Sequence, residues 1–252
     1  GAASRMFKNL FAFLSSPSDS PSTDFERTFF DQIDSFAFFG TLDAACRTNE
    51  GMDVHELIAA GRYKAVVANL LEARGMDYGE LPKGLLLFHG SADGPRTALE
   101  EHLVEGALYA RNQAGRVNIH LTVSPEHQAL FEQLVRRVVP AYESRYGVQY
   151  DISFSTQQPS TDTVAVDLQN QPFREADGTI LFRPGGHGAL IGNLDAMNAD
   201  VVFIKNIDNV VPDRMKPVTV TYKQLLAGIL VDLHDRISNY VRLIDSGACS
   251  PE

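Results

Sequence analysis

The apolar residues in the first third of the chain follow helical spacing. Between residues 24 and 74 they recur every three or four positions, over 25–38, 54–60 and 63–72, which predicts amphipathic helices. Thr23 and Glu26 have the spacing of a capping box, so the first of these helices is expected to begin beside them. The serine- and proline-rich segment 15–23 before it predicts a mobile linker. Aromatic residues are frequent on these helices, and we expect them to form core contacts rather than a ligand pocket (Phe29, Phe30, Phe36 and Phe38).

After Gly79, short apolar runs alternate with longer helical patterns. The runs at 84–89, 117–123 and 150–156 predict strands, and the patterns at 97–113 and 124–146 predict helices. Thr97 with Glu100 has the spacing of a capping box, and Ser124 precedes a proline at the favoured first helical position. Further strands are expected at 164–168 and 201–206. A last helix is expected to begin at Thr221 and to run to about Leu243.

This alternation is typical of an α/β sheet. The sequence therefore predicts a single α/β domain over residues 1–252, with a mixed, mainly parallel sheet between helical layers. The helical stretch at 24–74 is interpreted as an insertion on that domain.

Composition narrows the function classes. The 252 residues carry a formal net charge of −10, which argues against a nucleic-acid surface because phosphate backbones require clustered lysine and arginine. No apolar run is long enough to span a bilayer, so no membrane partner is expected. Cys46 and Cys249 fit neither a disulfide framework nor a zinc site, which favours a reducing cytoplasm.

The first eight residues, GAASRMFK, are typical of a phosphate-binding loop without its preceding strand. Backbone N–H groups at a helix N-terminus bind anions, and Arg5 and Lys8 bring positive charge to the same place. The loop itself consists of Gly1, Ala2, Ala3 and Ser4. An equally good interpretation is an ordinary chain end that opens an amphipathic helix.

Three later segments also carry candidate chemistry. Lys83 lies between a proline and a glycine just before a predicted strand, where an ammonium group reaches phosphate or simply faces solvent. The segment RPGGHGAL at 183–190 either lets a ligand approach the backbone closely or forms a tight turn. Asp208, in IKNIDN, follows an apolar run, where its carboxylate suits magnesium or serves as a turn residue.

The order of these four segments resembles that of the UDP-sugar pyrophosphorylases, a group of sugar nucleotidyltransferases. Longer stretches, such as RTALEEHLVEGALYA and FRPGGHGALIGNLD, resemble an uncharacterised bacterial family with no assigned function, and this similarity covers nearly the whole chain. The resemblance implies a three-layer fold of the nucleotide-diphospho-sugar transferase type. It also implies that the chain is a fragment of a longer protein.

The same resemblance implies a reaction and a site. A nucleoside triphosphate and a sugar 1-phosphate are expected to give an NDP-sugar and pyrophosphate with the help of Mg²⁺. Arg5, Lys83 and Asp208 are the implied catalytic residues, and Asp208 is the implied metal ligand. The implied substrate-binding residues are Gly1, Ala2, Ala3, Ser4, Lys8, Gln158, Pro184, Gly185, Gly186, His187, Gly188 and Asn206.

Two departures from the pyrophosphorylase pattern keep other functions open. Ala3 stands in place of a glycine and His187 in place of an asparagine, which favours a degenerate nucleotide-sugar binding module. A glycosyltransferase of related fold is a further alternative. Other polar clusters are interpreted as structural. Ser124 near His127 is expected to be a helix cap rather than part of a hydrolase triad, and Glu100, Glu101 and His102 are expected to form a solvated helix face.

Overall fold

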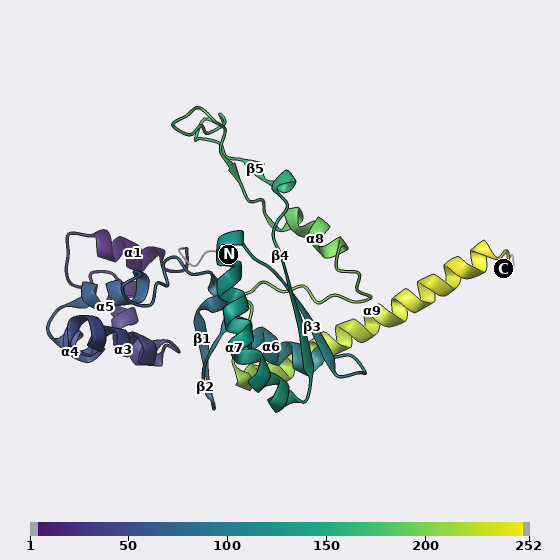
Figure 1. Ribbon diagram of the computed structural model, residues 1–252, viewed down its shortest axis with the longest axis horizontal. Helices are drawn as coiled ribbons and strands as arrows, with labels where there is room; N and C mark the ends of the chain where they lie inside the picture. The colour runs from purple at the N-terminus through teal and green to yellow at the C-terminus, as the bar shows by residue number, and fades with distance from the viewer. Residues whose placement is uncertain (1–4, 249–252) are drawn as a thin grey trace.

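The computed structural model describes residues 5–248, which form a helical lobe, a mixed α/β lobe, an exposed hairpin and a long final helix (Figure 1). The helical lobe consists of α1 (Lys8–Ser15), α2 (Asp24–Asp31), α3 (Phe39–Glu50), α4 (Val54–Ala59) and α5 (Tyr63–Leu71). Thr23 caps α2 in the predicted capping box, since its side chain accepts from Glu26 N–H and the Glu26 carboxylate accepts from Thr23 N–H.

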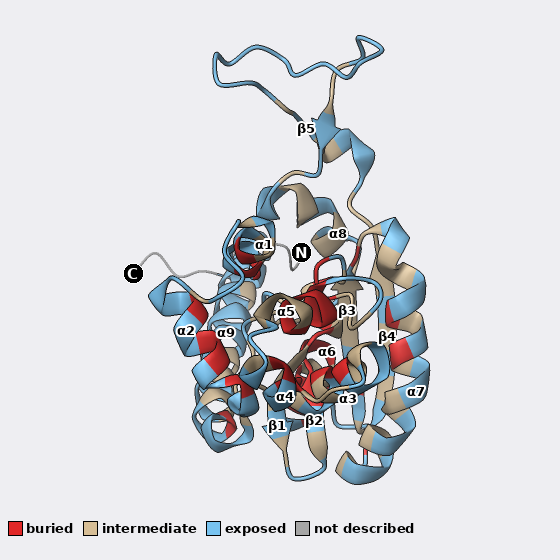
Figure 2. Cartoon of the chain, turned by 90° about the vertical axis from the view of Figure 1, so that its left-hand side faces the viewer, coloured by how far each residue is buried: buried red, intermediate tan, exposed pale blue. Residues whose placement is uncertain are grey.

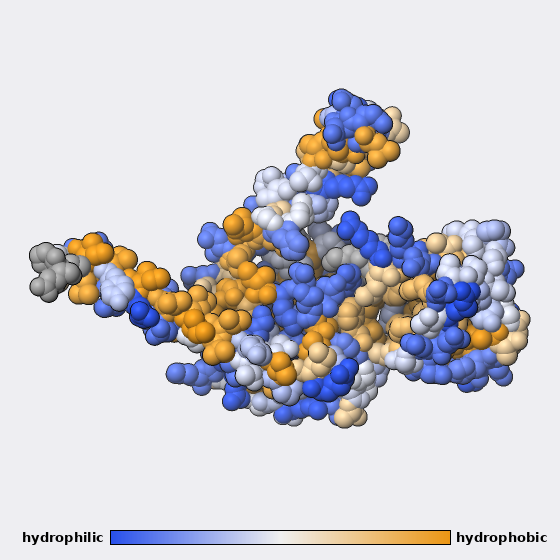
Figure 3. All heavy atoms as spheres, turned by 180° about the vertical axis from the view of Figure 1, so that it is seen from behind, coloured by the Kyte–Doolittle hydropathy of each residue, from blue (hydrophilic) through white to orange (hydrophobic). Residues whose placement is uncertain are grey.

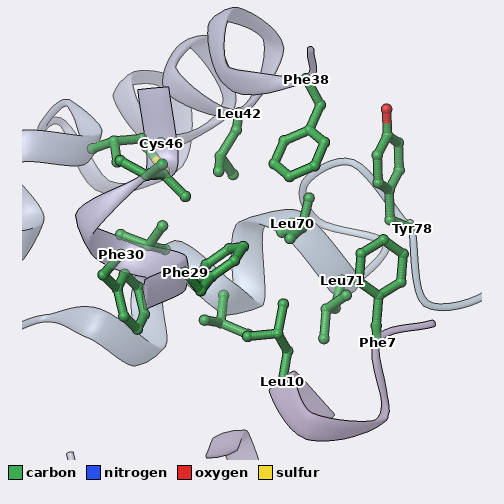
Figure 4. Close-up of a cluster of buried hydrophobic side chains, with 14 of the residues drawn as sticks. Phe7, Leu10, Phe29, Phe30, Phe38, Leu42, Cys46, Leu70, Leu71 and Tyr78 are labelled. Atoms are coloured by element: carbon green, nitrogen blue, oxygen red, sulfur yellow. The ribbon is translucent and has the colours of Figure 1, made fainter. Parts of the chain in front are cut away.

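A single aromatic-rich core holds the helical lobe together (Figure 4). Phe29, Phe30 and Phe38 are buried in it, and Phe36 packs against it, so the expectation that these rings are core contacts is confirmed. Phe7 from the turn before α1 is buried in the same core, as are two residues of α1 itself, Leu10 and Phe13. The helices predicted over 54–60 and 63–72 correspond to α4 and α5, whereas the one expected over 25–38 ends at Asp31, and α3 was not predicted. The lobe that these helices form also includes α1.

The mixed lobe contains β1 (Leu87–Ser91), β2 (Gly94–Thr97), α6 (Ala98–Tyr109), β3 (Arg116–Thr122), α7 (Gln128–Tyr146) and β4 (Gln149–Ser155). β1 and β2 form an antiparallel hairpin, whereas β3 and β4 pair in parallel. α7 makes the connection that a parallel pair needs. Thr97 caps α6 with Glu100, as predicted.

The remaining elements lie at the periphery. β5 (Thr163–Val164) and β6 (Phe182–Arg183) form a short antiparallel pair in an exposed hairpin, and α8 (Ile191–Asp195) follows it (Figure 2). α9 (Lys216–Asp245) projects away from the mixed lobe (Figure 1). Within residues 5–248, no helix combines the length and the apolar content needed to cross a lipid bilayer.

The predicted three-layer domain with a mainly parallel sheet is wrong. Over residues 5–248 the strands form three separate two-stranded sheets, and only the β3–β4 sheet is parallel. One reason is that the apolar run at 84–89 pairs locally with the strand that follows it. Another is that the run at 201–206 forms no ladder in the described part of the chain. Phe203 packs against Tyr109 of α6 and Lys205 donates to Glu105, while Val202 and Ile204 are exposed.

Two further boundaries differ from those predicted. The strand expected at 164–168 shrinks to the two residues of β5, whose side chains are exposed. The final helix begins at Lys216 rather than at Thr221, after a 3₁₀ turn over Asp213–Met215. The Thr221 hydroxyl lies inside the helix and donates to the carbonyl oxygen of Pro217 at 2.9 Å, so it is not a cap.

Candidate functional site

Lys83 and Asp208 meet although they lie far apart in the sequence. Lys83 opens a 3₁₀ turn over Lys83–Leu85, and its Nζ donates to Asp208 Oδ2 at 2.5 Å. The two side chains are 24% and 32% exposed, so solvent reaches the pair. The hydrogen bond from Lys83 lowers the pKa of the Asp208 carboxyl below its ordinary value.

Gly84 allows the two segments to approach. A Cβ at this position would lie 2.5 Å from Cε1 of Phe131 on α7 and 3.2 Å from Cγ1 of Ile207. No side chain fits there without a shift of the surrounding atoms, so Gly84 brings the 3₁₀ turn against the residue before Asp208. The sequence highlighted this glycine only as a neighbour of Lys83.

The segment that carries Asp208 is fixed to α6. Before Asp208, Lys205 donates to Glu105, and His102 Nε2 donates to the carbonyl oxygen of Ile207 at 3.0 Å. After it, Asp213 accepts from Arg96 at 2.7 Å. Because these contacts bracket Asp208, α6 and Arg96 on β2 determine where this carboxylate lies.

A buried ionic network beside α6 was not predicted. Glu101 is 1% exposed and accepts from Lys216, the first residue of α9, while Arg96 Nη1 lies 3.8 Å from the same carboxylate. His89 Nδ1 lies 3.2 Å from Glu101 Oε1. Burial alone would raise the pKa of Asp213, but the hydrogen bonds from Arg96 and Lys216 lower it overall.

The expectation of a solvated face is therefore wrong for Glu101 and His102. Glu101 is buried and His102 is half-buried, because the 205–213 segment and the start of α9 contact them. Burial lowers the pKa of His102. A sequence signal was present: apolar residues occur on several sides of α6, which is typical of a buried helix. Glu105 is also buried, and its Oε1 has no partner among the described atoms.

The glycine-rich segment 184–188 lies at the base of the exposed hairpin. A Cβ at Gly185 would lie 2.9 Å from the carbonyl oxygen of Thr161, so a close backbone approach does occur there. The approaching group is the chain's own backbone. Gly186 has φ −76°, and neither it nor its two glycine neighbours has positive φ. His187 is exposed and opens a 3₁₀ turn over His187–Leu190.

Gln158 joins this region, since its Nε2 lies 3.7 Å from a Cβ placed at Gly192 on α8. Asn193 Nδ2 donates to Ser155 Oγ at 2.8 Å and to the Thr156 carbonyl oxygen at 2.9 Å. α8 is thus attached at the carboxyl end of β4. Among the predicted site residues, the structure brings Lys83 and Asp208 together, whereas Gln158 lies against α8, which follows the 184–188 segment.

The remaining predicted residues are exposed or lie outside the described part of the chain. Asn206 is exposed, and its carbonyl oxygen accepts from Asn209 N–H at 3.0 Å, so Asp208 lies inside a turn as the alternative interpretation proposed. Arg5 and Lys8 are exposed, and over residues 5–248 no hydrogen bond or ion pair joins either of them to Lys83 or Asp208. The other loop residues lie outside the described residues: Gly1, Ala2, Ala3 and Ser4.

The described side chains near Asp208 do not form a protein cage for magnesium. No group of three or more His, Cys, Asp or Glu side chains suited to a metal ion occurs in the described part of the chain. Mg²⁺ is, however, commonly held by one or two carboxylates together with substrate phosphates and water. Asp208 supplies one carboxylate, one oxygen of which is bonded to Lys83. The site therefore fits a magnesium ion that arrives with phosphate, and not a resident ion in a protein cage.

Two further features of the described chain are a serine–histidine pair and a cavity. Ser124 precedes the 3₁₀ turn over Pro125–His127, and its Oγ bonds to His127 Nδ1 at 2.8 Å. A cavity of about 590 Å³ opens between the helical lobe and β1. Phe29, Phe36 and Phe38 line it, so these core residues also form a pocket, contrary to the expectation of core contacts alone. Neither Lys83 nor Asp208 lines it.

The full length of the chain, residues 1–252, matches the family model described as Domain of unknown function (DUF4301). The chain belongs to the DUF4301 family. No curated protein and no solved structure matches it. The predicted membership of an uncharacterised family is confirmed for this DUF4301 chain. The resemblance to UDP-sugar pyrophosphorylases is not shown, and it stays a prediction.

Proposed function

We propose that this DUF4301 chain binds a nucleoside triphosphate together with a sugar 1-phosphate at Lys83 and Asp208 and transfers the nucleotidyl group. In this reaction a phosphate oxygen of the sugar 1-phosphate attacks the α-phosphorus. The bond from the α-phosphorus to the oxygen that bridges it to the β-phosphorus breaks, and pyrophosphate leaves. The observation that carries the proposal is the meeting of Lys83 and Asp208 across 125 positions of sequence.

Charge supports this proposal. A lysine ammonium has three N–H donors, so one hydrogen bond to Asp208 leaves two for phosphate oxygens. Nucleotidyl transfer needs positioning and neutralisation of the developing negative charge rather than a protein nucleophile. Asp208 orients the ammonium, and the partial exposure of the pair gives a ligand access to both groups.

Magnesium fits the proposal as an ion bound jointly by Asp208 and the triphosphate. When bound, it would neutralise phosphate charge and polarise the phosphoryl oxygens. The chain's own contribution is to hold the Asp208 carboxylate in place through the contacts of Lys205 and Ile207 with α6.

A second candidate function is nucleotide-sugar binding without turnover. It is favoured because Asp208 belongs to no acidic cluster in residues 5–248, whereas a catalytic site with two metal ions would need more carboxylates. Both candidates place phosphate oxygens at Lys83, and they differ in whether pyrophosphate is released.

A pyrophosphate-exchange assay on the full chain tests the proposal. Each of ATP, CTP, GTP and UTP is supplied with Mg²⁺, labelled pyrophosphate and glucose 1-phosphate. We expect exchange with at least one triphosphate, and we expect it to fall about 100-fold or more in Lys83→Ala and in Asp208→Asn, because charge stabilisation of this kind contributes that much. Lys64→Ala is a matched control, since Lys64 pairs with Asp19 at 3.3 Å in the helical lobe.

Each result has a distinct meaning. Triphosphate or NDP-sugar binding without exchange supports the binding module and overturns the transfer reaction. Equal exchange in Lys83→Ala, Asp208→Asn and the wild type shows that the reaction takes place elsewhere.

A further inference from the structure

α9 has an unusual position for a helix rich in apolar residues. Its first turns contact α6 and the 3₁₀ turn before it, and the last of these contacts is a hydrogen bond from Gln224 Nε2 to the Leu108 carbonyl oxygen at 3.4 Å. Beyond Gln224, the side-chain hydrogen bonds and ion pairs recorded within residues 5–248 are internal to the helix. About two-thirds of α9 therefore extends freely from the lobe (Figure 1).

A continuous apolar stripe runs along this free part. Its members recur every three or four residues, so they share one face of the helix. Each is between 46% and 65% exposed. The stripe consists of Tyr222, Leu226, Ile229, Leu233, Ile237, Tyr240 and Ile244. Figure 3 shows hydrophobic side chains along the projecting helix.

The polar side of the helix, not the apolar side, faces the rest of the chain. Lys216 Nζ donates to the buried Glu101, and the ammonium of Lys223 lies 5.9 Å from the ring centroid of Phe203. Gln224 bonds to α6. These contacts fix the rotation of the helix about its axis, so that the stripe points away from the mixed lobe.

We propose that the stripe is an interface with a second copy of this chain, in which the two α9 helices pack antiparallel with the twofold axis level with His234. Large exposed apolar patches on soluble proteins mark interaction sites. The proposal is independent of the function proposed for Lys83 and Asp208.

Charge complementarity supports the second copy as the occupant. With the axis level with His234, Asp232 of one copy lies level with Arg236 of the other, and the twofold axis repeats this pair on the other side of the axis. Equivalent flanks of two antiparallel helices face each other, and within each of these pairs both residues lie on the same flank at helical spacing. Both pairs therefore bring opposite charges together, and the overlap ends where α9 of each copy meets its own lobe.

The available area is also sufficient. At roughly 100 Å² for each half-exposed large side chain, the stripe offers about 700 Å² per copy. Standard stable interfaces bury about 800 Å² per partner, and the flanking leucines and valines of α9 add to the stripe. A pair of copies therefore reaches the size that a specific dimer needs.

Sedimentation velocity of the full chain tests the dimer. We expect a species of twice 27.7 kDa in the wild type and a monomer, or at least a tenfold weaker dimer, in Leu233→Asp. Val231→Asp is the matched control, because Val231 is 45% exposed and lies on the opposite face of α9. Leu233 is exposed in the single copy, so circular dichroism is expected to show the same helix content in both variants. A wild-type monomer at every concentration, or equal loss in both variants, overturns the proposal.

Cysteine cross-linking tests the orientation in a Cys249→Ser background. Leu233→Cys lies near the proposed axis and is expected to give a dimer with a short bismaleimide, whereas Tyr222→Cys lies far from its equivalent and is expected to give none. Cross-linking at both positions would show parallel helices and overturn the antiparallel arrangement. Cross-linking at neither would overturn the pairing of α9 helices.

Discussion

α6 buries charged side chains, whereas α9 exposes apolar ones. α6 buries two carboxylates, Glu101 and Glu105, each 1% exposed, while α9 leaves residues such as Leu226 and Ile237 largely in solvent. On α6 the charges are enclosed by segments of the same chain that bring lysine and arginine to them. On α9 the apolar side chains have no such cover in the described residues. α6 thus binds other segments of its own chain through ion pairs, whereas the exposed apolar side chains of α9 suit the proposed contact with a second copy.

The buried charges of α6 are also what links the fold to the candidate site. Taking a charge out of water is costly unless it is paired and hydrogen-bonded, so a segment that carries the matching charge is held firmly. At the start of the segment that contains Asp208, Lys205 donates to Glu105 of α6. At its end, Asp213 accepts from Arg96. The position of Asp208 beside Lys83 is thus a consequence of the ionic contacts around α6.

The largest expected effect is the loss of the Glu101 carboxylate. Glu101→Ala removes the buried carboxylate that accepts from Lys216, which keeps only Asp213 among the described acidic side chains. Arg96 loses one of its three acidic neighbours and keeps Asp93 and Asp213. We expect the free energy of unfolding to fall by about 3–5 kcal/mol, as breaking a buried ion pair does. Denaturant titration measures it. Glu132→Ala, on the exposed surface of α7 near Arg136, is expected to change the free energy by less than about 1 kcal/mol.

A double substitution sharpens this prediction. Glu101→Met combined with Lys216→Met removes both charges, and we expect it to recover most of the stability lost in Glu101→Ala, because apolar replacements of buried pairs are often neutral. A double variant less stable than Glu101→Ala would show that apolar packing cannot replace the ionic contacts of Glu101 and Lys216.

An intermediate effect is expected from matched valines on the two helices. Val104 on α6 is 2% exposed, whereas Val231 on α9 is 45% exposed. We expect Val104→Ala to lower the free energy of unfolding by about 2 kcal/mol through lost burial and a small cavity. Val231→Ala is expected to stay within about 0.5 kcal/mol of the wild type. Thermal and denaturant unfolding measure both, and equal losses would contradict the contrast between the helices.

The smallest expected effect is a pH dependence from His102. Burial lowers its pKa in the folded chain, so below the ordinary value of about 6.5 the unfolded chain binds more protons than the folded chain. The stability contributed by neutral His102 is therefore complete above that value and is lost as the pH falls toward the folded pKa. We expect His102→Gln to flatten the decline in unfolding free energy between pH 7 and pH 5.

Denaturant titration across this pH range measures the slope. His234→Gln serves as the control, since the His234 side chain is 74% exposed, and it should keep the wild-type slope. A slope that is equally steep in His102→Gln would place the pH dependence in another group.

The sequence predicted local structure better than long-range packing. The capping boxes at Thr23 and Thr97 depend only on residues three positions apart, so the pattern was sufficient to place those helix starts. The apolar run at 201–206 predicts a strand, because the spacing of apolar residues does not distinguish a strand from an extended segment that packs against a helix. Its partner is α6, and nothing in the local pattern indicates that.

The candidate site was predicted to a similar extent. Motif order singled out both Lys83 and Asp208, and the structure brings them together. The order of the motifs did not indicate Glu101 or Lys216, because a buried ion pair between two distant segments has no local sequence pattern. The glycines at 184–188 were interpreted either as ligand-binding or as a turn; Gly185 approaches the chain's own Thr161, and their role in substrate binding stays a prediction.

The most direct test of the central claim is calorimetric titration of the full chain with Mg²⁺ and the triphosphate that gives the strongest exchange, or with UTP if none does. We expect binding by the wild type and by Lys64→Ala with equal affinity. Binding by Lys83→Ala is expected to be at least tenfold weaker, because a hydrogen bond to a charged group contributes about 1.5–3 kcal/mol. Equal affinity in all three proteins, or no binding by any of them, would contradict a phosphate site at Lys83 and Asp208.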